Sequence, residues 1–400
     1  MNKYPVVVIT EEGKSWLDKG QRWMYRNNLA KEVTGCKTGD VVQIQSVQGE
    51  YLATGFYHET SHIVVRILSQ NEEEVIDEAF FAKKIKDALD YRFVVEKDNL
   101  DNCRLIFGDA DLLPGLTVDK YNDVLVTQIT TYALEQRKDL IYQLLIDVLK
   151  ENHQTVNYIY ERNDVKARTK EGLDLYKGFY KNEGKTDLVI SENDLLLNVD
   201  IQNGQKTGYF LDQKTNRLLV RNMAKGLRVL DCFTHTGGFA LNAAKGEAKS
   251  VTAVDVSNIA LTEAKKNADL NHFTNVDFVQ ADVFEYLDEI DQGQFDLIIL
   301  DPPAFTKSKS TVKQAYYGYK RINLQAMQKL NHGGYLATCS CSRYMETTLF
   351  EQMLKEASKE AHVLLKQVSV TQQNHDHPIL WSMEETSYLK FFIFQIIKEY

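Results

Sequence analysis

The spacing of apolar residues changes along the chain, and the first region reads as short strands. Apolar runs of strand length lie at residues 6–10, 41–47, 51–57 and 62–68. Short strands at close spacing, separated by turn signals, are typical of a small β-barrel. We therefore predict a β-rich domain over residues 1–71, interrupted by one helix within residues 11–21.

A charged stretch beginning near Asn71 then switches to helical spacing and opens a second region. Here the pattern predicts helices at residues 79–92 and 133–151 and strands at residues 123–130 and 156–162. A mixture of this kind indicates a separate central α+β domain over residues 72–190.

Residues 191–400 form the most regular region. We expect a hairpin over residues 195–212, followed by strands and helices in alternation. The strands are expected at residues 227–232, 250–256, 276–280, 295–300, 334–340, 362–370 and 387–397, and the helices at 237–245, 258–271, 284–290, 317–330 and 347–360. Continuous apolar strands that alternate with helices predict an α/β fold with a doubly wound parallel sheet, covered on both faces.

The amino-acid composition excludes several classes of protein. The chain has 400 residues, of which 44% are hydrophobic and 26% charged, which excludes disorder as its main state. A net charge of -9 argues against a globally basic nucleic-acid coat but allows a local basic patch. Five scattered cysteines do not suggest a disulfide framework or a zinc site, and we expect no metal. The sequence shows no targeting or membrane segment, so we expect a cytoplasmic protein without membrane attachment.

Ligands of doubly wound sheets bind beyond the carboxyl ends of the strands, so the residues that follow each strand matter most. Asp231 is followed by a turn containing Gly237, but the turn lacks the glycine spacing of dinucleotide sites, which favours a nucleoside ligand without a diphosphate. Asp255 is placed to accept ribose hydroxyls, and Asp282 to accept an adenine amino group. The structural alternative is that both acids only cap helices.

The fourth and fifth strands of this region end in the most specific signals. Asp301 precedes two adjacent prolines and Phe305, which predicts a rigid rim suited to a planar base with an exocyclic amine. Cys339 and Cys341 end the neighbouring strand on one face, with Cys341 nearer the crevice. Arg343 would help to stabilise a thiolate there, although free cysteines are more often inert core residues.

Together these residues resemble a class I S-adenosylmethionine-dependent methyltransferase. More closely, the chain resembles the bacterial 23S ribosomal RNA cytosine-C5 methyltransferase I family, which has an N-terminal PUA domain. The resemblance covers nearly the whole chain and is carried by residues 204–217, 231–241, 301–310, 318–323 and 338–342, together with PUA-like stretches at 39–42 and 61–68. It implies a Rossmann-like, seven-stranded sheet in residues 191–400.

The resemblance also implies a cofactor, a reaction and a set of site residues. The cofactor would be S-adenosylmethionine (SAM), with S-adenosylhomocysteine (SAH) as the product, and the reaction would form 5-methylcytosine in 23S ribosomal RNA. Cys341 would be the catalytic nucleophile, and Asp301 would hold the edge of the base. The cofactor-binding residues would be Phe210, Asp231, Phe233, Gly237, Asp255, Ser257, Asp282, Asp301 and Pro303.

The chemistry accounts for a cysteine at this place. Carbon 5 of cytosine is too weak a nucleophile to attack a sulfonium methyl group unless a thiolate first adds at carbon 6. Cys339 could compete with Cys341 in this role, and we favour Cys341.

A local basic stretch offers a surface for RNA. Five basic residues without an intervening acid, interleaved with tyrosines, follow the two prolines: Lys307, Lys309, Lys313, Lys320 and Arg321. Positive charge beside aromatic rings is used to bind single strands and flipped bases. The alternative is a solvated loop and helix face.

Three other functions stay open at this point. A base-N methyltransferase acting on an exocyclic amine or guanine N7 would need no thiol. A non-catalytic RNA-binding assembly factor would not need SAM. A nicotinamide-dependent oxidoreductase fits least, because the pyrophosphate glycines are missing. Exposed strand edges would support a homodimer, but no motif specifies one.

Overall fold

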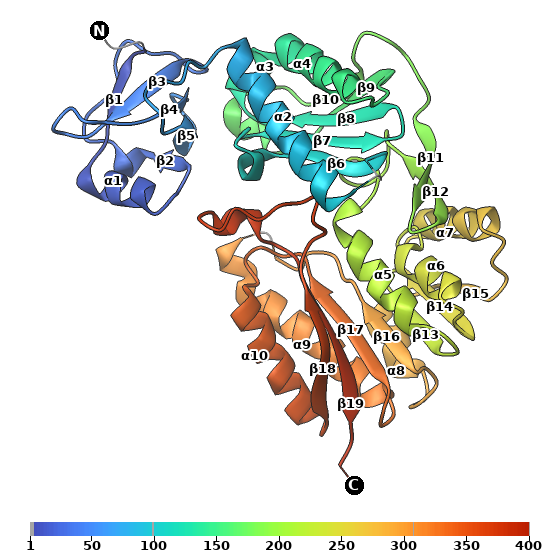
Figure 1. The fold of residues 1–400 in the computed structure, drawn as a ribbon. Helices are drawn as coiled ribbons and strands as arrows, with labels where there is room; N and C mark the ends of the chain where they lie inside the picture. The colour runs from blue at the N-terminus through green and yellow to red at the C-terminus, as the bar shows by residue number, and fades with distance from the viewer. Residues whose placement is uncertain (1–3, 98–99, 307, 400) are drawn as a thin grey trace. The chain divides into compact units, whose positions relative to one another are not determined.

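The computed structural model describes residues 4–97, 100–306 and 308–399. The chain forms two compact units, each assembled from several stretches of sequence, as the colours of Figure 1 allow the reader to trace. The first unit comprises Met1–Ile190, Val199–Leu211 and His375–Thr386, and the second comprises Ser191–Asn198, Asp212–Asn374 and Ser387–Tyr400. Two segments of the region predicted as residues 191–400 therefore pack within the first unit.

The first unit begins with a five-stranded sheet in the order β1-β3-β4-β5-β2. Its strands are β1 (Val6–Val8), β2 (Trp23–Tyr25), β3 (Val41–Gln45), β4 (Tyr51–Tyr57) and β5 (Ile63–Ser69). Helix α1 (Glu11–Asp18) starts where the sequence predicts it, because the Thr10 side chain accepts a hydrogen bond from Gly13 N and caps the helix. The pattern missed only the short β2, which has three residues.

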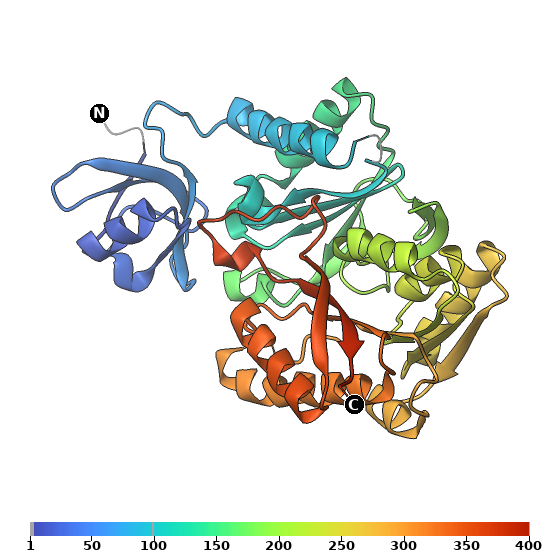
Figure 2. The ribbon, with the colours of Figure 1, turned by 60° about the horizontal axis from the view of Figure 1, so that its bottom comes forward.

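The central part of the first unit is α+β, as predicted. Its sheet has the order β10-β9-β8-β7-β6, and Figure 2 shows α2 along one face. The elements are α2 (Glu78–Val95), β6 (Asn102–Phe107), β7 (Leu116–Tyr121), β8 (Val124–Ile129), α3 (Tyr132–Glu135), α4 (Lys138–Glu151), β9 (Tyr158–Asn163) and β10 (Tyr176–Phe179). The single helix predicted over residues 133–151 is two helices, separated at Gln136 and Arg137.

The hairpin predicted over residues 195–212 is wrong. Strand β12 (Leu195–Asp200) pairs instead with the preceding β11 (Asp187–Glu192). Asn193 and Asp194 join them with φ values of 51° and 55°, as a two-residue turn with both φ positive requires. Residues after β12 form turns, in which Gly208 has a φ of 128°.

Segment His375–Thr386 interrupts the second unit in sequence and packs within the first. The Asp376 carboxylate accepts a hydrogen bond from Arg104 N at 2.8 Å, and the Asp376 carbonyl accepts one from Arg92 at 2.9 Å. Asp376 and the neighbouring His377 are buried, and His377 Nδ1 lies 2.7 Å from the Asp376 carboxylate.

The second unit contains the predicted seven-stranded sheet, in the order β15-β14-β13-β16-β17-β19-β18. Its strands are β13 (Arg228–Cys232), β14 (Ser250–Asp255), β15 (Val276–Gln280), β16 (Leu297–Leu300), β17 (Tyr335–Ser340), β18 (Leu364–Thr371) and β19 (Lys390–Ile397). β13 to β17 pair in parallel, whereas β19 runs antiparallel to both of its neighbours.

Helices cover both faces of this sheet (Figure 1). They are α5 (Lys214–Met223), α6 (Gly238–Lys245), α7 (Asn258–Leu270), α8 (Val283–Glu289), α9 (Val312–Lys329) and α10 (Thr347–Glu360). Val229 packs into the apolar cluster that contains α5 and α6, whereas Leu230 packs into the cluster that contains α8, α9 and α10. Burial on both faces explains why these strands show no polar alternation.

Six 3₁₀ helices complete the described elements: η1 (Arg26–Asn28), η2 (Gly108–Asp111), η3 (Arg168–Glu171), η4 (Leu211–Gln213), η5 (Lys309–Thr311) and η6 (Glu384–Thr386). Helix α9 starts five residues before its predicted start because η5 leads directly into it. Within the described ranges, every helix is too short or too polar to cross a bilayer.

The close approach of α5 and α6 depends on a glycine. Gly246 ends α6, and a Cβ atom there would lie 2.1 Å from the carbonyl oxygen of Arg221 on α5. Because that oxygen belongs to the backbone, one of the two helices would have to shift.

We expect Gly246→Ala to destabilise the second unit by about 2 kcal/mol, the usual cost of forced overpacking. The midpoint of urea denaturation should fall accordingly. Gly334→Ala is the milder comparison, because a Cβ there would lie 3.1 Å from the Leu330 side chain and 3.2 Å from the carbonyl oxygen of Asn331, against 2.1 Å from a backbone oxygen at Gly246. Equal midpoints for the two variants would contradict the importance of the α5–α6 contact.

Candidate active site

The carboxylate of Asp231 is buried at the carboxyl end of β13 and is only partly satisfied. Asp231 is 1% exposed, and its Oδ2 accepts hydrogen bonds from Thr234 Oγ1 at 2.6 Å and Ala240 N at 2.9 Å. Within the described residues, Oδ1 is buried without a partner. Burial raises the pKa of this carboxyl to about 7. A cation placed against Oδ1 would therefore hold the group ionised.

The turn after Asp231 is held in an unusual backbone conformation. Phe233, His235 and Gly237 all have positive φ, at 63°, 51° and 86°. For the two residues with side chains this conformation costs about 1–2 kcal/mol each, so the surrounding structure must impose it. Gly237 then forms the N-cap of α6. The strain agrees with a loop shaped for a ligand.

Asp255 and Ser257 shape the end of β14. Asp255 accepts hydrogen bonds from the backbone amides of His235 and Ser257, both at 2.9 Å. The Ser257 hydroxyl accepts a hydrogen bond from Ala260 N at 3.2 Å and caps α7. Asp255 therefore joins two loops of the crevice, and each of its oxygens keeps lone-pair capacity for a ribose hydroxyl.

Asp282 follows β15 and caps α8. Its Oδ1 accepts hydrogen bonds from Phe284 N at 2.8 Å and Glu285 N at 3.3 Å. This contact bears out the capping role that the sequence left as an alternative. The predicted contact with an adenine amino group stays a prediction.

The parallel pairing of β16 and β17 brings Asp301 beside the first cysteine. Leu300 lies opposite Thr338 in the sheet, so the next residues of the two strands are neighbours. Cys339 Sγ donates a hydrogen bond to Asp301 Oδ1 at 2.9 Å. Pro302 is buried and Pro303 exposed directly after Asp301, so the rim is fixed on one side and open on the other.

Cys339 is poorly suited to act as a nucleophile. It is fully buried, and burial together with the nearby Asp301 charge raises the pKa of its thiol well above the usual range. A thiol that donates to a carboxylate keeps its proton. Cys339 therefore orients Asp301.

Cys341 is half-buried beyond the end of β17 and packs against the apolar cluster of α5 and α6. The residues on either side of it are held by one phenol, since Tyr319 lies 3.0 Å from Ser340 Oγ and 3.1 Å from Ser342 Oγ. Burial raises the pKa of this phenol to about 12, so it stays a neutral hydrogen-bonding group. The backbone that carries Cys341 is thus fixed on both sides.

Two residues at this site have contacts that the sequence did not specify. Gln213 Nε2 donates to Asp301 Oδ1 at 3.2 Å and approaches Cys339 Sγ at 3.5 Å, and Tyr319 holds the two serines. Both lie within stretches that carry the family resemblance, residues 204–217 and 318–323. The resemblance was the signal for Gln213, and Tyr319 was also one of the tyrosines of the basic stretch, but neither signal specified these contacts.

Phe210 is the one predicted cofactor-binding residue outside the second unit. It belongs to segment Val199–Leu211 of the first unit, and Lys206 Nζ lies 4.6 Å from the centroid of its ring. Its role, like those of the other predicted site residues, stays a prediction.

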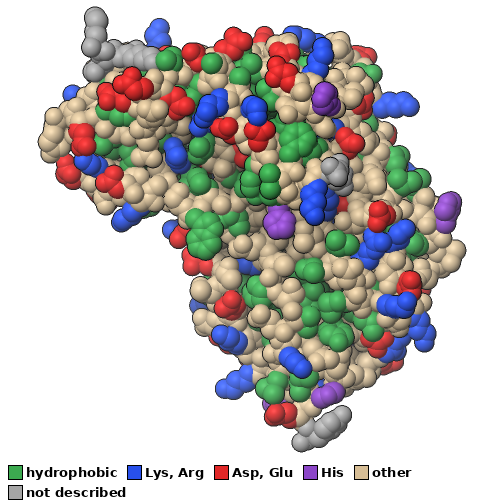
Figure 3. Space-filling view, viewed as in Figure 1, with side chains coloured by type: hydrophobic (Ala, Val, Ile, Leu, Met, Phe, Trp, Pro, Cys, Tyr) green, Lys and Arg blue, Asp and Glu red, His purple; other side chains and the backbone are tan. Residues whose placement is uncertain are grey.

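The five basic residues predicted to bind RNA differ in their availability. Lys309 and Lys313 are exposed, and no ion pair involves them within the described residues. Lys320 pairs with Glu360 at 2.6 Å and Glu356 at 3.3 Å, and Arg321 pairs more loosely with an acid of α8 at 3.8 Å. Lys307 lies outside the described residues. On the face shown in Figure 3, basic and acidic side chains are interspersed.

The donor set of the crevice fits SAM better than a metal. No cluster of three or more potential metal ligands occurs in the described parts of the chain. The unpartnered Oδ1 of Asp231 suits the ammonium of the methionine moiety, and Asp255 suits ribose hydroxyls. The glycine turn leaves room without offering pyrophosphate-binding glycines.

Two family models match the chain. The model of an S-adenosylmethionine-dependent methyltransferase matches residues 175–394, and that of a PUA-like domain matches residues 7–70. Among solved structures, a proposed SAM-dependent methyltransferase from Streptococcus mutans aligns with this chain with a TM-score of 0.81 at 22% identity. The alignment covers 98% of this chain and 100% of that one. A methyltransferase complexed with SAH aligns equally well. The predicted fold and cofactor are confirmed.

Curated relatives cover nearly the whole chain. "Ribosomal RNA large subunit methyltransferase I" of Aliivibrio fischeri (strain MJ11) is 39% identical over 94% of this chain and 95% of its own length. The protein of the same name from Vibrio cholerae serotype O1 is 39% identical over 98% of this chain and 100% of its own. The chain therefore belongs to the ribosomal RNA large subunit methyltransferase I family of S-adenosylmethionine-dependent methyltransferases.

Proposed function

We propose that the protein methylates carbon 5 of a cytosine in large-subunit (23S) ribosomal RNA and that Cys341 forms a transient covalent bond to the base. The observation that carries this proposal is the pairing of β16 with β17. It sets Asp301 beside Cys339 at 2.9 Å, and Cys341 follows two residues further toward the crevice. The names of the relatives support the RNA substrate.

A thiolate is required because carbon 5 of cytosine is not nucleophilic by itself. Addition of the Cys341 sulfur to carbon 6 makes the ring an enamine, and carbon 5 then forms a bond to the methyl group. SAM supplies that methyl on a sulfonium and leaves as SAH. Loss of the carbon-5 proton restores the ring double bond and expels Cys341 as a thiolate.

The chain positions the base through its rigid rim. The Asp301 carboxylate is oriented by Cys339 and Gln213, so one of its oxygens is engaged before the substrate arrives. A carboxylate at this place supplies the kind of acceptor that the exocyclic amine of cytosine requires. The two prolines that follow cannot donate from their nitrogen atoms, and they hold the strand exit in a fixed path.

Base-N methylation is the alternative within the same fold, and it requires no thiol. The role of Cys341 discriminates between the two reactions. We favour methylation of carbon 5 because Cys341 is half-buried and lies toward the crevice, whereas Cys339 is buried. The homodimer suggested by the exposed strand edges stays a prediction.

Cys341→Ala should lower methyl transfer to unmodified 23S ribosomal RNA by at least about a thousandfold, because the covalent step is lost. SAH binding, measured by calorimetry, should stay unchanged. Cys36→Ser is the matched control, since Cys36 is a half-buried thiol in the PUA-like domain. RNA containing 5-fluorocytosine should trap a denaturant-stable complex with the unaltered protein and none with Cys341→Ala. Full activity of that variant would refute the covalent role and favour base-N methylation.

Cofactor affinity should depend on pH through Asp231. Its free carboxyl has a pKa of about 7 because it is buried, and the ammonium of SAH binds the ionised form. Affinity should therefore fall as pH drops through 7, by up to about tenfold per pH unit. Asp231→Asn should bind SAH more weakly and with a flatter pH profile between pH 5.5 and 8. Asp277→Asn, an exposed acid on β15, should behave like the unaltered protein. A pH-independent affinity for the unaltered protein would contradict this assignment.

RNA binding should depend on salt through the two exposed lysines after the rim. The double variant Lys309→Ala, Lys313→Ala should weaken binding to 23S ribosomal RNA. It should also reduce the slope of log Kd against log salt by about 1.4, at about 0.7 per phosphate contact. The control Lys265→Ala, Lys355→Ala removes the same charge from α7 and α10. Equal slopes for both variants would place the RNA elsewhere.

A further inference from the structure

A buried lysine, Lys390, lies at the carboxyl end of β17, where the sequence had indicated only Arg343 as a cation. Lys390 is the first residue of β19, which runs antiparallel to β17, and it pairs with Ser340. Antiparallel pairing places the start of β19 at the edge of the sheet where β17 ends. Lys390 therefore lies beside the backbone that leads to Cys341, and its side chain, like that of Phe392, is on the face of the sheet opposite that of Cys339 and Phe391.

The ammonium of Lys390 is held in place by backbone oxygens. Lys390 is 5% exposed, and Nζ donates hydrogen bonds to the carbonyl oxygens of Ser342 at 2.8 Å and Tyr388 at 2.9 Å. Ser342 directly follows Cys341. No carboxylate lies within ion-pair distance of Lys390 among the described residues, so backbone oxygens, and not an ion pair, hold its ammonium.

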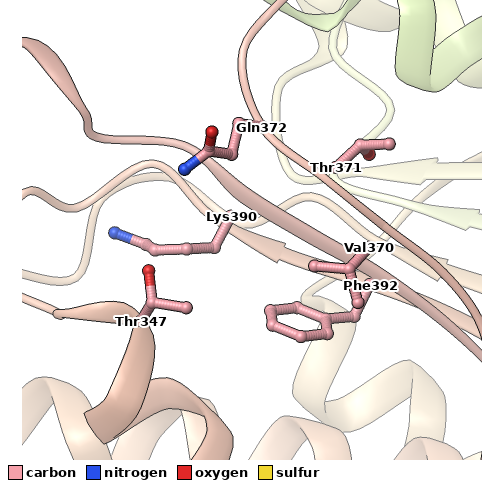
Figure 4. A pocket seen from close by; sticks show the side chains of 6 residues that line it. All are labelled: Thr347, Val370, Thr371, Gln372, Lys390 and Phe392. Atoms are coloured by element: carbon pink, nitrogen blue, oxygen red, sulfur yellow. The ribbon is translucent and has the colours of Figure 1, made fainter. Parts of the chain in front are cut away.

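A cavity of about 260 Å³ opens beside this charge, lined by Thr347, Val370, Thr371, Gln372, Lys390 and Phe392. In Figure 4 the polar ends of Lys390, Gln372 and Thr347 lie on one side of the cavity, whereas Val370 and Phe392 lie on the other.

A nearby cation would be needed to stabilise a thiolate at Cys341, because this residue packs against an apolar cluster. A thiol packed against apolar residues keeps its proton unless a positive charge stabilises the thiolate. Arg343, the cation expected from the sequence, is exposed, and solvent screens an exposed charge. Lys390 is buried and fixed, so its field is screened far less.

We propose that Lys390 is a positioning residue for the covalent step and that its ammonium, bonded to the carbonyl of the residue after Cys341, stabilises the Cys341 thiolate electrostatically across the end of the sheet. The inference rests on the proposed function. The thiol proton passes to water before the base is attacked, Lys390 keeps its own proton, and Cys341 leaves the adduct as a thiolate in the field of the same ammonium. The titratable groups that act on Lys390 are the thiols of Cys341 and Cys339 and the carboxylate of Glu346 before α10.

The charge of Lys390 is itself sensitive to pH. Burial lowers the pKa of its ammonium to about 8. Its support for the thiolate is therefore present below pH 8 and is lost above that pH.

The test is the rate of iodoacetamide alkylation of Cys341 against pH, without RNA or SAM. Lys329 and Arg343 bound a tryptic peptide that holds Cys339 and Cys341, and fragmentation of this peptide resolves the two. In the unaltered protein, Cys341 should react with an apparent pKa of about 7. Lys390→Met should slow alkylation about tenfold at pH 7, with the difference vanishing by about pH 9.5. Lys390→Arg should restore the fast reaction.

Two controls sharpen the result. Lys398→Met removes the lysine that directly follows β19, at the end of the strand opposite to Lys390, where Nζ contacts the carbonyl of Gln328 at 3.5 Å. This variant should leave the profile unchanged. Arg343→Met tests the competing cation. Unchanged alkylation in Lys390→Met, or a shift caused by Arg343→Met alone, would overturn the proposal.

The test also holds if Lys390→Met does not fold, as judged by SAH binding. In that case an apparent pKa of 8.5 or higher for Cys341 in the unaltered protein would refute a stabilised thiolate. Because alkylation needs no methyl transfer, its outcome is independent of the proposed function. Loss of the covalent mechanism would appear only in the Cys341→Ala assay.

Discussion

Parallel pairing of β16 with β17 sets Leu300 opposite Thr338 and so determines which side chains meet at the crevice. Asp301 and Cys339 become neighbours, and every further contact builds on that pair. Gln213 reaches the same carboxylate oxygen, and Tyr319 fixes the serines on either side of Cys341. A shift of one residue in this register would turn Asp301 or the two cysteines to the opposite face of the sheet.

Burial acts on the charged groups of this edge in one direction, toward the neutral form. It raises the pKa of Asp231 and of Cys339, and it lowers the pKa of Lys390. The pKa values of Asp231 and Lys390 thereby move close to neutral pH, where a ligand of opposite charge readily changes the ionisation of either group. The pKa of Cys339 moves further above neutral pH, so this thiol keeps its proton and acts only as a hydrogen-bond donor.

Much of the second unit could be predicted from the sequence because its strands are buried on both faces and its helices have clear periodicity. The acids after β13, β14 and β16 were identifiable for the same reason, since they end unambiguous strands. The prediction of a hairpin over residues 195–212 was wrong because the pattern missed the Asn193–Asp194 turn and the segment containing Gly208 was taken for a strand. Gln213, Tyr319 and Lys390 could not be placed, because only tertiary packing brings them to the end of β17.

The interleaving of the two units has a practical consequence. Asp376 and His377 belong to a segment only twelve residues long, His375–Thr386, which interrupts the catalytic fold in sequence. A truncated protein starting near residue 191 would keep this segment but lose Arg92 and Arg104, its hydrogen-bonding partners. Apolar residues of the segment that are buried now, such as Met383, would become exposed and favour aggregation, so expression of the catalytic fold alone calls for redesign of the loop between β18 and β19.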